Sequence, residues 1–152
     1  MLKEMGIALQ LYSVREDMEK DLPGTLRAVK AMGYEGVEFA GLYGYEPAAL
    51  RALLEEIGLT AVSAHVPLEE WLVDSAACAA AYKTVGCRFA AIPWLNEDKR
   101  PGTPGFEDVK AVIPRIAAVC AAQDMPLLYH NHDFEFVKLD GEYALDRLYR
   151  EF

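Results

Sequence analysis

Short runs of β-branched and apolar residues alternate along the chain with longer segments whose apolar side chains recur every three or four positions. The first pattern indicates buried strands, and the second indicates amphipathic helices. Five strands are predicted, at residues 6–11, 36–39, 60–64, 89–93 and 126–130. Helices are predicted between them at 22–32, 47–57, 68–85 and 106–122, and a further helix begins within 143–152.

Glycine directly follows three of the predicted helices. Gly33, Gly58 and Gly86 each stand where the last helical turn ends. A glycine adopts the left-handed conformation that closes many helices because it has no Cβ. These positions therefore support the predicted helix ends.

Polar residues close the predicted strands at a nearly constant interval. Gln10, Glu38, His65 and the Pro93-Trp94 pair follow one another at 28, 27 and 28 residues. A strand–helix unit that repeats in this way indicates parallel strands joined by right-handed crossovers. Two folds fit this repeat, an eight-unit barrel and an open, doubly wound sheet.

The turn after the first strand favours the barrel. A doubly wound nucleotide-binding sheet carries a glycine-rich turn there, whereas residues 12–15 contain no glycine. Polar strand ends that share one site are typical of a barrel. We therefore predict an α/β fold of the (β/α)8 TIM-barrel type, with residues 1–152 as a single domain.

The sequence pattern accounts for five βα units rather than eight. A complete barrel needs roughly 250 residues, so we expect an incomplete barrel, truncated after strand five and the start of its helix. Either the chain is part of a longer gene product, or copies associate as a homo-oligomer that covers the exposed barrel edge.

Composition narrows the cellular setting. The hydrophobic content of 53% is sufficient for a sizeable core. The longest apolar runs are strand-sized and interrupted by charge, so no membrane span is expected. Residues 1–5 lead into the first strand without a signal-peptide pattern, which makes the cytoplasm the expected location. Cys78, Cys87 and Cys120 lack the paired spacing of a zinc site, and we expect buried, inert thiols.

The net charge of −9 bears on partners. Nucleic-acid binding draws most of its affinity from Lys and Arg side chains that neutralise phosphates. No basic stripe occurs in this sequence, so a nucleic-acid partner is not expected. The motifs of serine hydrolases, P-loop nucleotidases and zinc peptidases are absent as well.

A polar cluster at residues 129–135 follows the fifth predicted strand. It contains His130 and His132, with Asn131, Asp133 and Glu135 at the alternate positions. In an extended chain the two sets face opposite sides. One set would point into the barrel mouth and the other would orient it from behind; the pattern leaves open which.

Four further residues at strand ends are candidates for chemistry. Glu38 lies inside an apolar run, where an unpaired charge is costly. It is either half of an ion pair, for example with Arg15, or an acid or base in the barrel interior. Gln10 is likewise a polar residue between apolar neighbours, and it is either structural or part of a site in the barrel interior. His65 is either a hydrogen-bonded structural residue or a ligand, and Trp94 either stacks on a sugar ring or packs in the core.

Four motifs together resemble the sugar phosphate isomerase/epimerase family of the xylose isomerase-like barrel superfamily. They are the segments 9–15 (LQLYSVR), 33–39 (GYEGVEF), 63–68 (SAHVPL) and 129–136 (YHNHDFEF). The resemblance implies an eight-stranded barrel with a divalent metal, Mn, Co, Mg or Zn, at its mouth. Family ligands come from the ends of strands five to eight, which makes His130, His132 and Glu135 the metal candidates here.

The resemblance also implies roles at the other strand ends. Glu38, His65 and Glu135 become the catalytic candidates, and Gln10, Trp94 and Asn131 the substrate-binding candidates. The implied reaction removes a proton next to a carbonyl and gives an enediolate, and the substrate is a small sugar, sugar phosphate, keto-sugar or cyclitol. The alternatives are an inactive barrel fragment that lacks the other ligands and a metal-dependent enzyme like an AP endonuclease.

Overall fold

Five parallel strands form one sheet, in the spatial order in which they occur along the chain. The structure, a computed structural model, describes residues 6–152; residues 1–5, for which no signal-peptide pattern was found, lie outside that range. The strands are β1 (Ala8–Gln10), β2 (Gly36–Ala40), β3 (Thr60–His65), β4 (Phe89–Ile92) and β5 (Leu127–Tyr129). All five predicted strands are therefore confirmed, with ends that differ by one or two residues.

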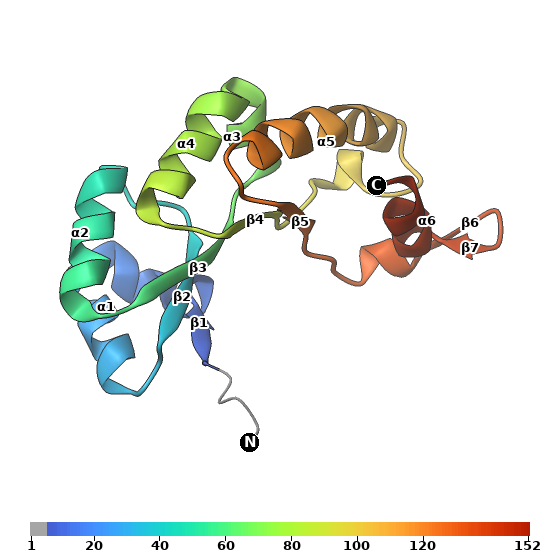
Figure 1. Cartoon of the computed structure of the whole chain (residues 1–152). Helices are drawn as coiled ribbons and strands as arrows, with labels where there is room; N and C mark the ends of the chain where they lie inside the picture. The colour runs from blue at the N-terminus through green and yellow to red at the C-terminus, as the bar shows by residue number, and fades with distance from the viewer. Residues whose placement is uncertain (1–5) are drawn as a thin grey trace, which may run out of the picture.

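The helices form a single layer that curves around the sheet (Figure 1). They are α1 (Arg15–Ala31), α2 (Pro47–Ile57), α3 (Leu68–Val73), α4 (Ser75–Val85) and α5 (Gly105–Ala122). Helix α1 packs beside α2, α2 beside α4, and α4 beside α5. A doubly wound sheet would carry helices on both faces, so this arrangement confirms a fold of the barrel type.

The apolar periodicity explains why these helices pack where they do. In α2, Leu50 and Leu54 are four residues apart and are almost fully buried. Gly58 ends α2 in the left-handed conformation, with φ 79°, and its N–H donates to Leu54 O. Gly33 and Gly86 also have positive φ angles, of 100° and 109°. The predicted glycine-closed helix ends are thus confirmed.

Two predicted helices have different boundaries in the structure. The helix predicted at 22–32 begins earlier, at Arg15, and is kinked at Asp21, whose φ and ψ are −153° and 83°. The helix predicted at 68–85 is two helices, α3 and α4, separated by Asp74. The Asp74 carboxylate accepts from the N–H groups of Ala76 and Ala77 at 3.1 and 2.9 Å. This side-chain cap starts a new helix that apolar spacing alone does not reveal.

The core lies between the sheet and the helix layer. Phe39, Trp71 and Tyr82 are its largest fully buried side chains, with Leu11 and Met18 beside them. Cys87 and Cys120 are also buried and Cys78 is half-buried; burial raises the pKa of all three thiols, to about 12, 11 and 12 respectively. Inert thiols are therefore expected from this structure too.

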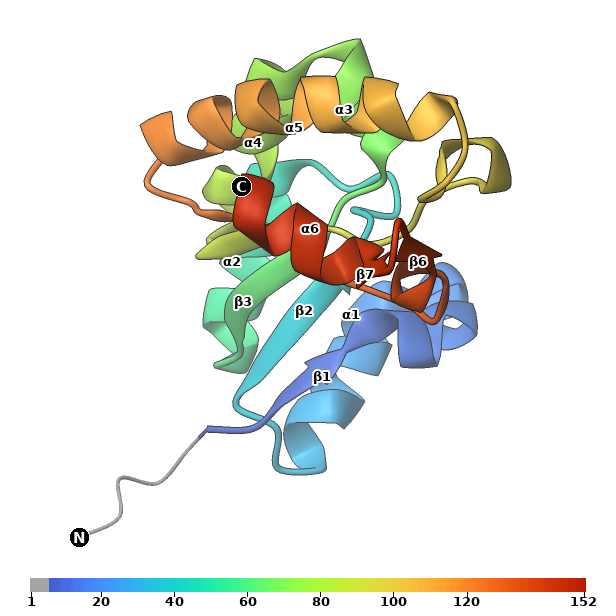
Figure 2. The ribbon, with the colours of Figure 1, turned by 90° about the vertical axis from the view of Figure 1, so that its right-hand side faces the viewer.

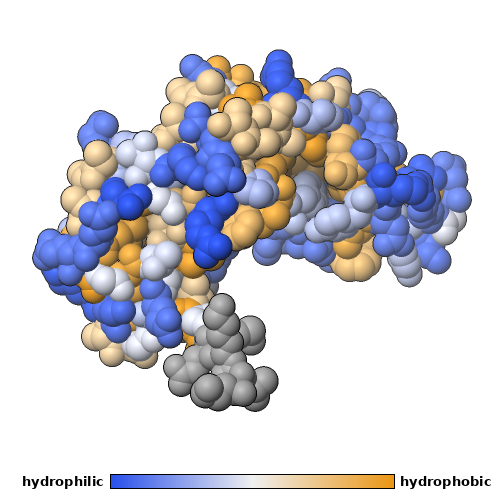
Figure 3. Space-filling model, in the orientation of Figure 1, coloured by the Kyte–Doolittle hydropathy of each residue, from blue (hydrophilic) through white to orange (hydrophobic). Residues whose placement is uncertain are grey.

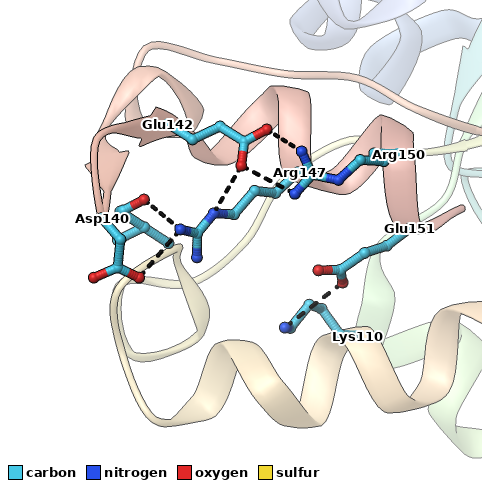
Figure 4. A network of polar contacts seen from close by, with 7 residues as sticks. Lys110, Asp140, Glu142, Arg147, Arg150 and Glu151 are labelled. Carbon is cyan, nitrogen blue, oxygen red and sulfur yellow. Dashed lines mark hydrogen bonds and ion pairs between the residues drawn. The ribbon is translucent and has the colours of Figure 1, made fainter.

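A small subdomain follows the sheet. It contains the 3-10 turn η3 (Phe134–Phe136), a hairpin of β6 (Lys138–Leu139) and β7 (Glu142–Tyr143), and helix α6 (Ala144–Glu151). Figure 2 shows α6 in front of the sheet, with the hairpin beside it. Ion pairs link its elements (Figure 4): Arg147 contacts Asp140 and Glu142, and Lys110 of α5 contacts Glu151 at 3.7 Å. Exposed pairs of this kind each contribute little to stability.

The surface is mixed in character. In Figure 3 hydrophilic residues dominate both ends of the view, and apolar surface is more continuous between them. Among residues 6–152, every helix is too short or too polar to cross a lipid bilayer. Within the same range, the outer edges of β1 and β5 pair with no further strand.

Candidate active site

A cavity of about 1000 Å³ lies at the carboxyl ends of the strands. Parallel strands all present these ends at the same side of a sheet, so residues far apart in sequence meet there. Six of the residues predicted from the sequence line this cavity: Gln10, Glu38, His65, Trp94, His130 and His132. The lining is completed by the polar residues Tyr12, Ser13 and Glu70 and by the small or apolar residues Ala40, Gly41, Pro67 and Pro93.

Four polar side chains form a continuous chain of hydrogen bonds across three strands. Glu38 Oε1 lies 3.0 Å from His65 Nε2, and Ser63 Oγ donates to Glu38 Oε2 at 2.5 Å. On the other side of the imidazole, Gln10 Nε2 lies 3.2 Å from His65 Nδ1. The side-chain oxygen of Gln10, Oε1, in turn accepts a hydrogen bond from the backbone N–H of Tyr12 at 2.7 Å. The charge of Glu38 is thus satisfied by His65 and Ser63 rather than by an ion pair with Arg15.

These partners determine which nitrogen of His65 carries the proton. A carboxylate only accepts hydrogen bonds, so Nε2, which faces Glu38, is assigned as the donor. Nδ1 is then the acceptor for the Gln10 amide. Burial is the main cause that lowers the pKa of His65 from its ordinary value of 6.5; Glu38 opposes this shift, and His130 and His132 add to it. The ring is therefore neutral at neutral pH, with both nitrogens engaged.

An aromatic wall stands beside this hydrogen-bonded group. The ring centroids of His65 and His130 are 4.6 Å apart, and those of His130 and His132 are 4.9 Å apart. Trp94 meets His132 edge-on at 4.6 Å, and Phe134 stacks on His132 at 5.4 Å. Trp94 remains 46% exposed, so its indole is available to a ligand and is not a core residue.

Arg100 braces this wall from outside the cavity. Its guanidinium carbon lies 4.7 Å from the centre of the Trp94 ring and 4.3 Å from that of Phe134. Its Nε donates to Leu95 O at 3.1 Å. The loop after β4 is therefore joined to the segment after β5.

The structure does not bring Glu135 or Asn131 into the cavity lining. Strand β5 ends at Tyr129, and η3 turns the Glu135 side chain into the interior, where it is fully buried. Its carboxylate accepts from Tyr129 OH at 2.5 Å and from the His132 N–H at 2.7 Å. The family resemblance made Glu135 a catalytic and metal-ligand candidate, but the 3-10 turn η3 directs its side chain away from the cavity lining. Asn131 is exposed, and its amide donates to His132 O.

The two histidines after β5 are the metal-binding candidates that do face the cavity. His132 Nδ1 is buried and has no hydrogen-bond partner within the described residues, which leaves that lone pair or N–H unsatisfied. Among residues 6–152, however, no three His, Cys, Asp or Glu side chains are grouped so as to hold a metal ion. The described residues therefore fit only part of a coordination shell.

Ser63 and Glu70 are polar residues of this site that sequence reasoning did not single out. Ser63 alternates with apolar neighbours in β3, and only the register Glu38↔Ser63 shows that its hydroxyl meets the carboxylate. Glu70 stands in the segment predicted as a helix at 68–85, where it was not singled out as a site residue. A usable signal was its place directly after the 63–68 motif, in the loop-to-helix region where barrel sites are built.

Solved structures with this fold are similar along most of the chain. A sugar phosphate isomerase/epimerase from Parabacteroides distasonis is 19% identical, with a TM-score of 0.75 over 99% of this chain and 63% of that one. A family 2 AP endonuclease from Brucella melitensis is 15% identical, with a TM-score of 0.63 over 82% of this chain and 55% of that one. An IolI protein with a bound zinc atom is 12% identical, with a TM-score of 0.60 over 82% of this chain and 51% of that one.

These likenesses show the fold, that of xylose isomerase-like TIM barrels. The chain spans just under two thirds of the first relative and about half of the other two. No family model matches the sequence. No curated protein matches it either.

Proposed function

We propose that this chain forms one side of the active site of a sugar isomerase or epimerase, which transfers a proton at a carbon next to a carbonyl. The observation that carries the proposal is the Glu38–His65 pair, 3.0 Å apart, in the cavity at the strand ends. The fold that the chain shares with a sugar phosphate isomerase/epimerase supports the same reaction class. The substrate class is a small sugar, keto-sugar or cyclitol, with or without a phosphate.

Glu38 is the base in this proposal. Ser63 and His65 each donate to one of its oxygens, which fixes the plane of the carboxylate. Each oxygen keeps a second lone pair that can take a carbon-bound proton. His65 is neutral and orients Glu38, while Gln10 orients His65. General bases held in this way typically contribute about 10²–10⁴-fold to a rate.

Trp94 is the proposed binding surface for the sugar ring. Its indole is 46% exposed and lines the cavity. An aromatic face packs well against the C–H side of a sugar, because both surfaces are apolar and flat. The hydroxyl groups would then turn toward the polar residues of the cavity, Gln10, Glu38 and His65.

A divalent metal, Mn, Co, Mg or Zn, belongs to the proposal as a cofactor. His130 and His132 are the residues of this chain that would hold it, and the unsatisfied Nδ1 of His132 supports that assignment. A bound metal polarises a carbonyl oxygen. Two imidazoles are fewer ligands than such ions require, so the described residues would supply part of the site.

The fold likeness to an AP endonuclease suggests DNA as a second candidate substrate. The charge of this chain argues against it. A net charge of −9 repels the phosphate backbone, and among residues 6–152 the cavity is lined by two carboxylates and by no Lys or Arg. Binding to an abasic duplex that weakens with salt would favour this alternative.

Solvent exchange tests the proposal directly. The chain is incubated in D2O with D-fructose, D-xylulose, D-fructose 6-phosphate and a keto-inositol, with each metal added in turn. NMR then records the loss of the C–H signal next to the carbonyl. We expect exchange with at least one of these probes, and about 10²–10⁴-fold slower exchange in Glu38→Gln.

Glu35→Gln is the matched control, because Glu35 is an exposed carboxylate directly before β2. It should exchange at the wild-type rate. Absence of exchange with every probe and metal, or an unchanged rate in Glu38→Gln, would refute the proposed function.

A further inference from the structure

A second carboxyl group, Glu70, lines the same cavity as Glu38. It lies in the first turn of α3, directly after the β3 strand end that carries His65. The neighbouring Glu69 is directed elsewhere, since its carboxylate contacts Asn96 and Lys99 at 3.1 and 3.3 Å. Of the two adjacent acids, Glu70 is thus the one that faces the site.

The surroundings of Glu70 differ from those of Glu38. One oxygen, Oε2, accepts a long hydrogen bond, of 3.3 Å, from the buried Tyr82 hydroxyl of α4, and Oε1 accepts none from residues 6–152. Burial raises the pKa of Glu70, and the Tyr82 hydrogen bond only partly offsets this shift. Cys78, also on α4, is a further titratable group near it, and Glu70 adds to the raised pKa of both Cys78 and Tyr82.

Two carboxyl groups in one cavity with different surroundings suit complementary roles as base and acid. Glu38 accepts a hydrogen bond on each oxygen, whereas Glu70 accepts a single long one, and partial burial shifts its pKa upward. A neutral carboxyl group carries a proton that it can donate. An acid of this kind is what the second half of an enediolate reaction needs.

We propose that Glu70 is a second catalytic residue, which returns a proton to the enediolate that Glu38 forms, so that the chain's chemistry is an epimerisation. This inference rests on the proposed function of Glu38. It assigns the returning proton to a different group from the one that removes it, and it places that group on the opposite side of the carbon, as inversion requires.

The proposed step balances as follows in atoms and electrons. Glu38 takes the proton, the C–H electron pair becomes the C=C bond, and the carbonyl π pair moves to oxygen. In the second half, the C=C pair takes the proton of Glu70, and the oxygen pair re-forms the carbonyl. The product has the composition of the substrate with one carbon inverted, Glu38 is left protonated and Glu70 ionised, and exchange with water restores both.

The test separates proton removal from proton return. Glu70→Gln and the control Glu69→Gln are incubated in D2O with the probe sugar that wild type exchanges. Both deuterium uptake into recovered substrate and formation of the epimer are measured. We expect Glu70→Gln to form epimer about 100-fold more slowly, while Glu38 still exchanges the substrate proton within a few-fold of the wild-type rate. Glu69→Gln should match wild type in both measurements.

Several results would overturn the inference. One is that Glu70→Gln forms epimer at the wild-type rate. Another is that Glu70→Gln loses exchange and epimer formation equally, and a third is that Glu69→Gln loses epimer formation as much as Glu70→Gln does. A Gln side chain can still accept from Tyr82, so the melting temperature should stay close to that of wild type, and this verifies that the variant is folded. If wild type neither exchanges nor epimerises any probe, the proposed function fails first and this inference with it.

Discussion

The side-chain amide of Gln10 lies 3.2 Å from Nδ1 of His65 and so joins β1 to β3 across the intervening strand β2. The intervening strand supplies Glu38, which holds the other ring nitrogen at 3.0 Å. One imidazole of β3 therefore contacts side chains from the two preceding strands, β1 and β2. Its orientation is determined by the register of the sheet rather than by a flexible loop.

Replacing Gln10 by leucine should destabilise the fold modestly. The variant leaves His65 Nδ1 without its donor in a half-buried site, while leucine keeps a similar volume. We expect a loss of about 1 kcal/mol in the free energy of unfolding, measured by urea denaturation. Gln123→Leu is the control, since Gln123 is exposed at the end of α5. Equal stability of the two variants would show that the Gln10–His65 contact contributes nothing.

Replacing Glu135 by alanine should have a larger effect. The substitution removes the acceptor of Tyr129 OH and of the His132 N–H within a buried environment. Leaving these two donors unsatisfied should cost on the order of 3 kcal/mol, which denaturation would measure. Glu97→Ala, at an exposed position in η2 (Glu97–Lys99), should change stability little. A small effect of Glu135→Ala would contradict the structural role derived from its two hydrogen bonds.

Glu70 should make stability depend on pH in a defined direction. Its pKa is raised in the folded chain above the ordinary carboxyl value of 4.5, so the folded state binds more protons than the unfolded state just above that pH. Wild type should therefore lose stability relative to Glu70→Gln as the pH rises from 4.5 through the folded pKa. Melting temperatures from pH 4 to 8 check this. The melting temperature of Glu69→Gln should change with pH in the same way as that of wild type. If the melting temperature of Glu70→Gln did so too, the prediction would be contradicted.

The sequence was sufficient to predict the fold because its signals are local and repeat. Helix α2 was predicted with its observed bounds, since Pro47 begins it and Gly58 closes it in a left-handed conformation. The strand-end residues were predicted for the same reason, because each βα unit places its polar residue at the same point. Helix breaks such as Asp74 depend on a side chain turning back to the backbone, which apolar spacing does not encode.

The site was predicted less completely because its details depend on contacts between strands. The bond from Ser63 to Glu38 follows from a shifted register between β2 and β3 at Val37 and Glu38, which no single-strand pattern indicates. The burial of Glu135 depends on where β5 ends. Alternation along an extended chain correctly grouped His130 with His132, but it does not hold beyond Tyr129, where the backbone turns.

Arg100 has a consequence for how the cavity selects its ligand. Its guanidinium rests on both Trp94 and Phe134 and is tethered to Leu95 O, so the indole has little freedom to rotate. A ligand that required another orientation of Trp94 would have to break several contacts at once. Under the proposed function, recognition at this wall is pre-organised, and it favours molecules whose shape already matches the ring over those that need an induced fit.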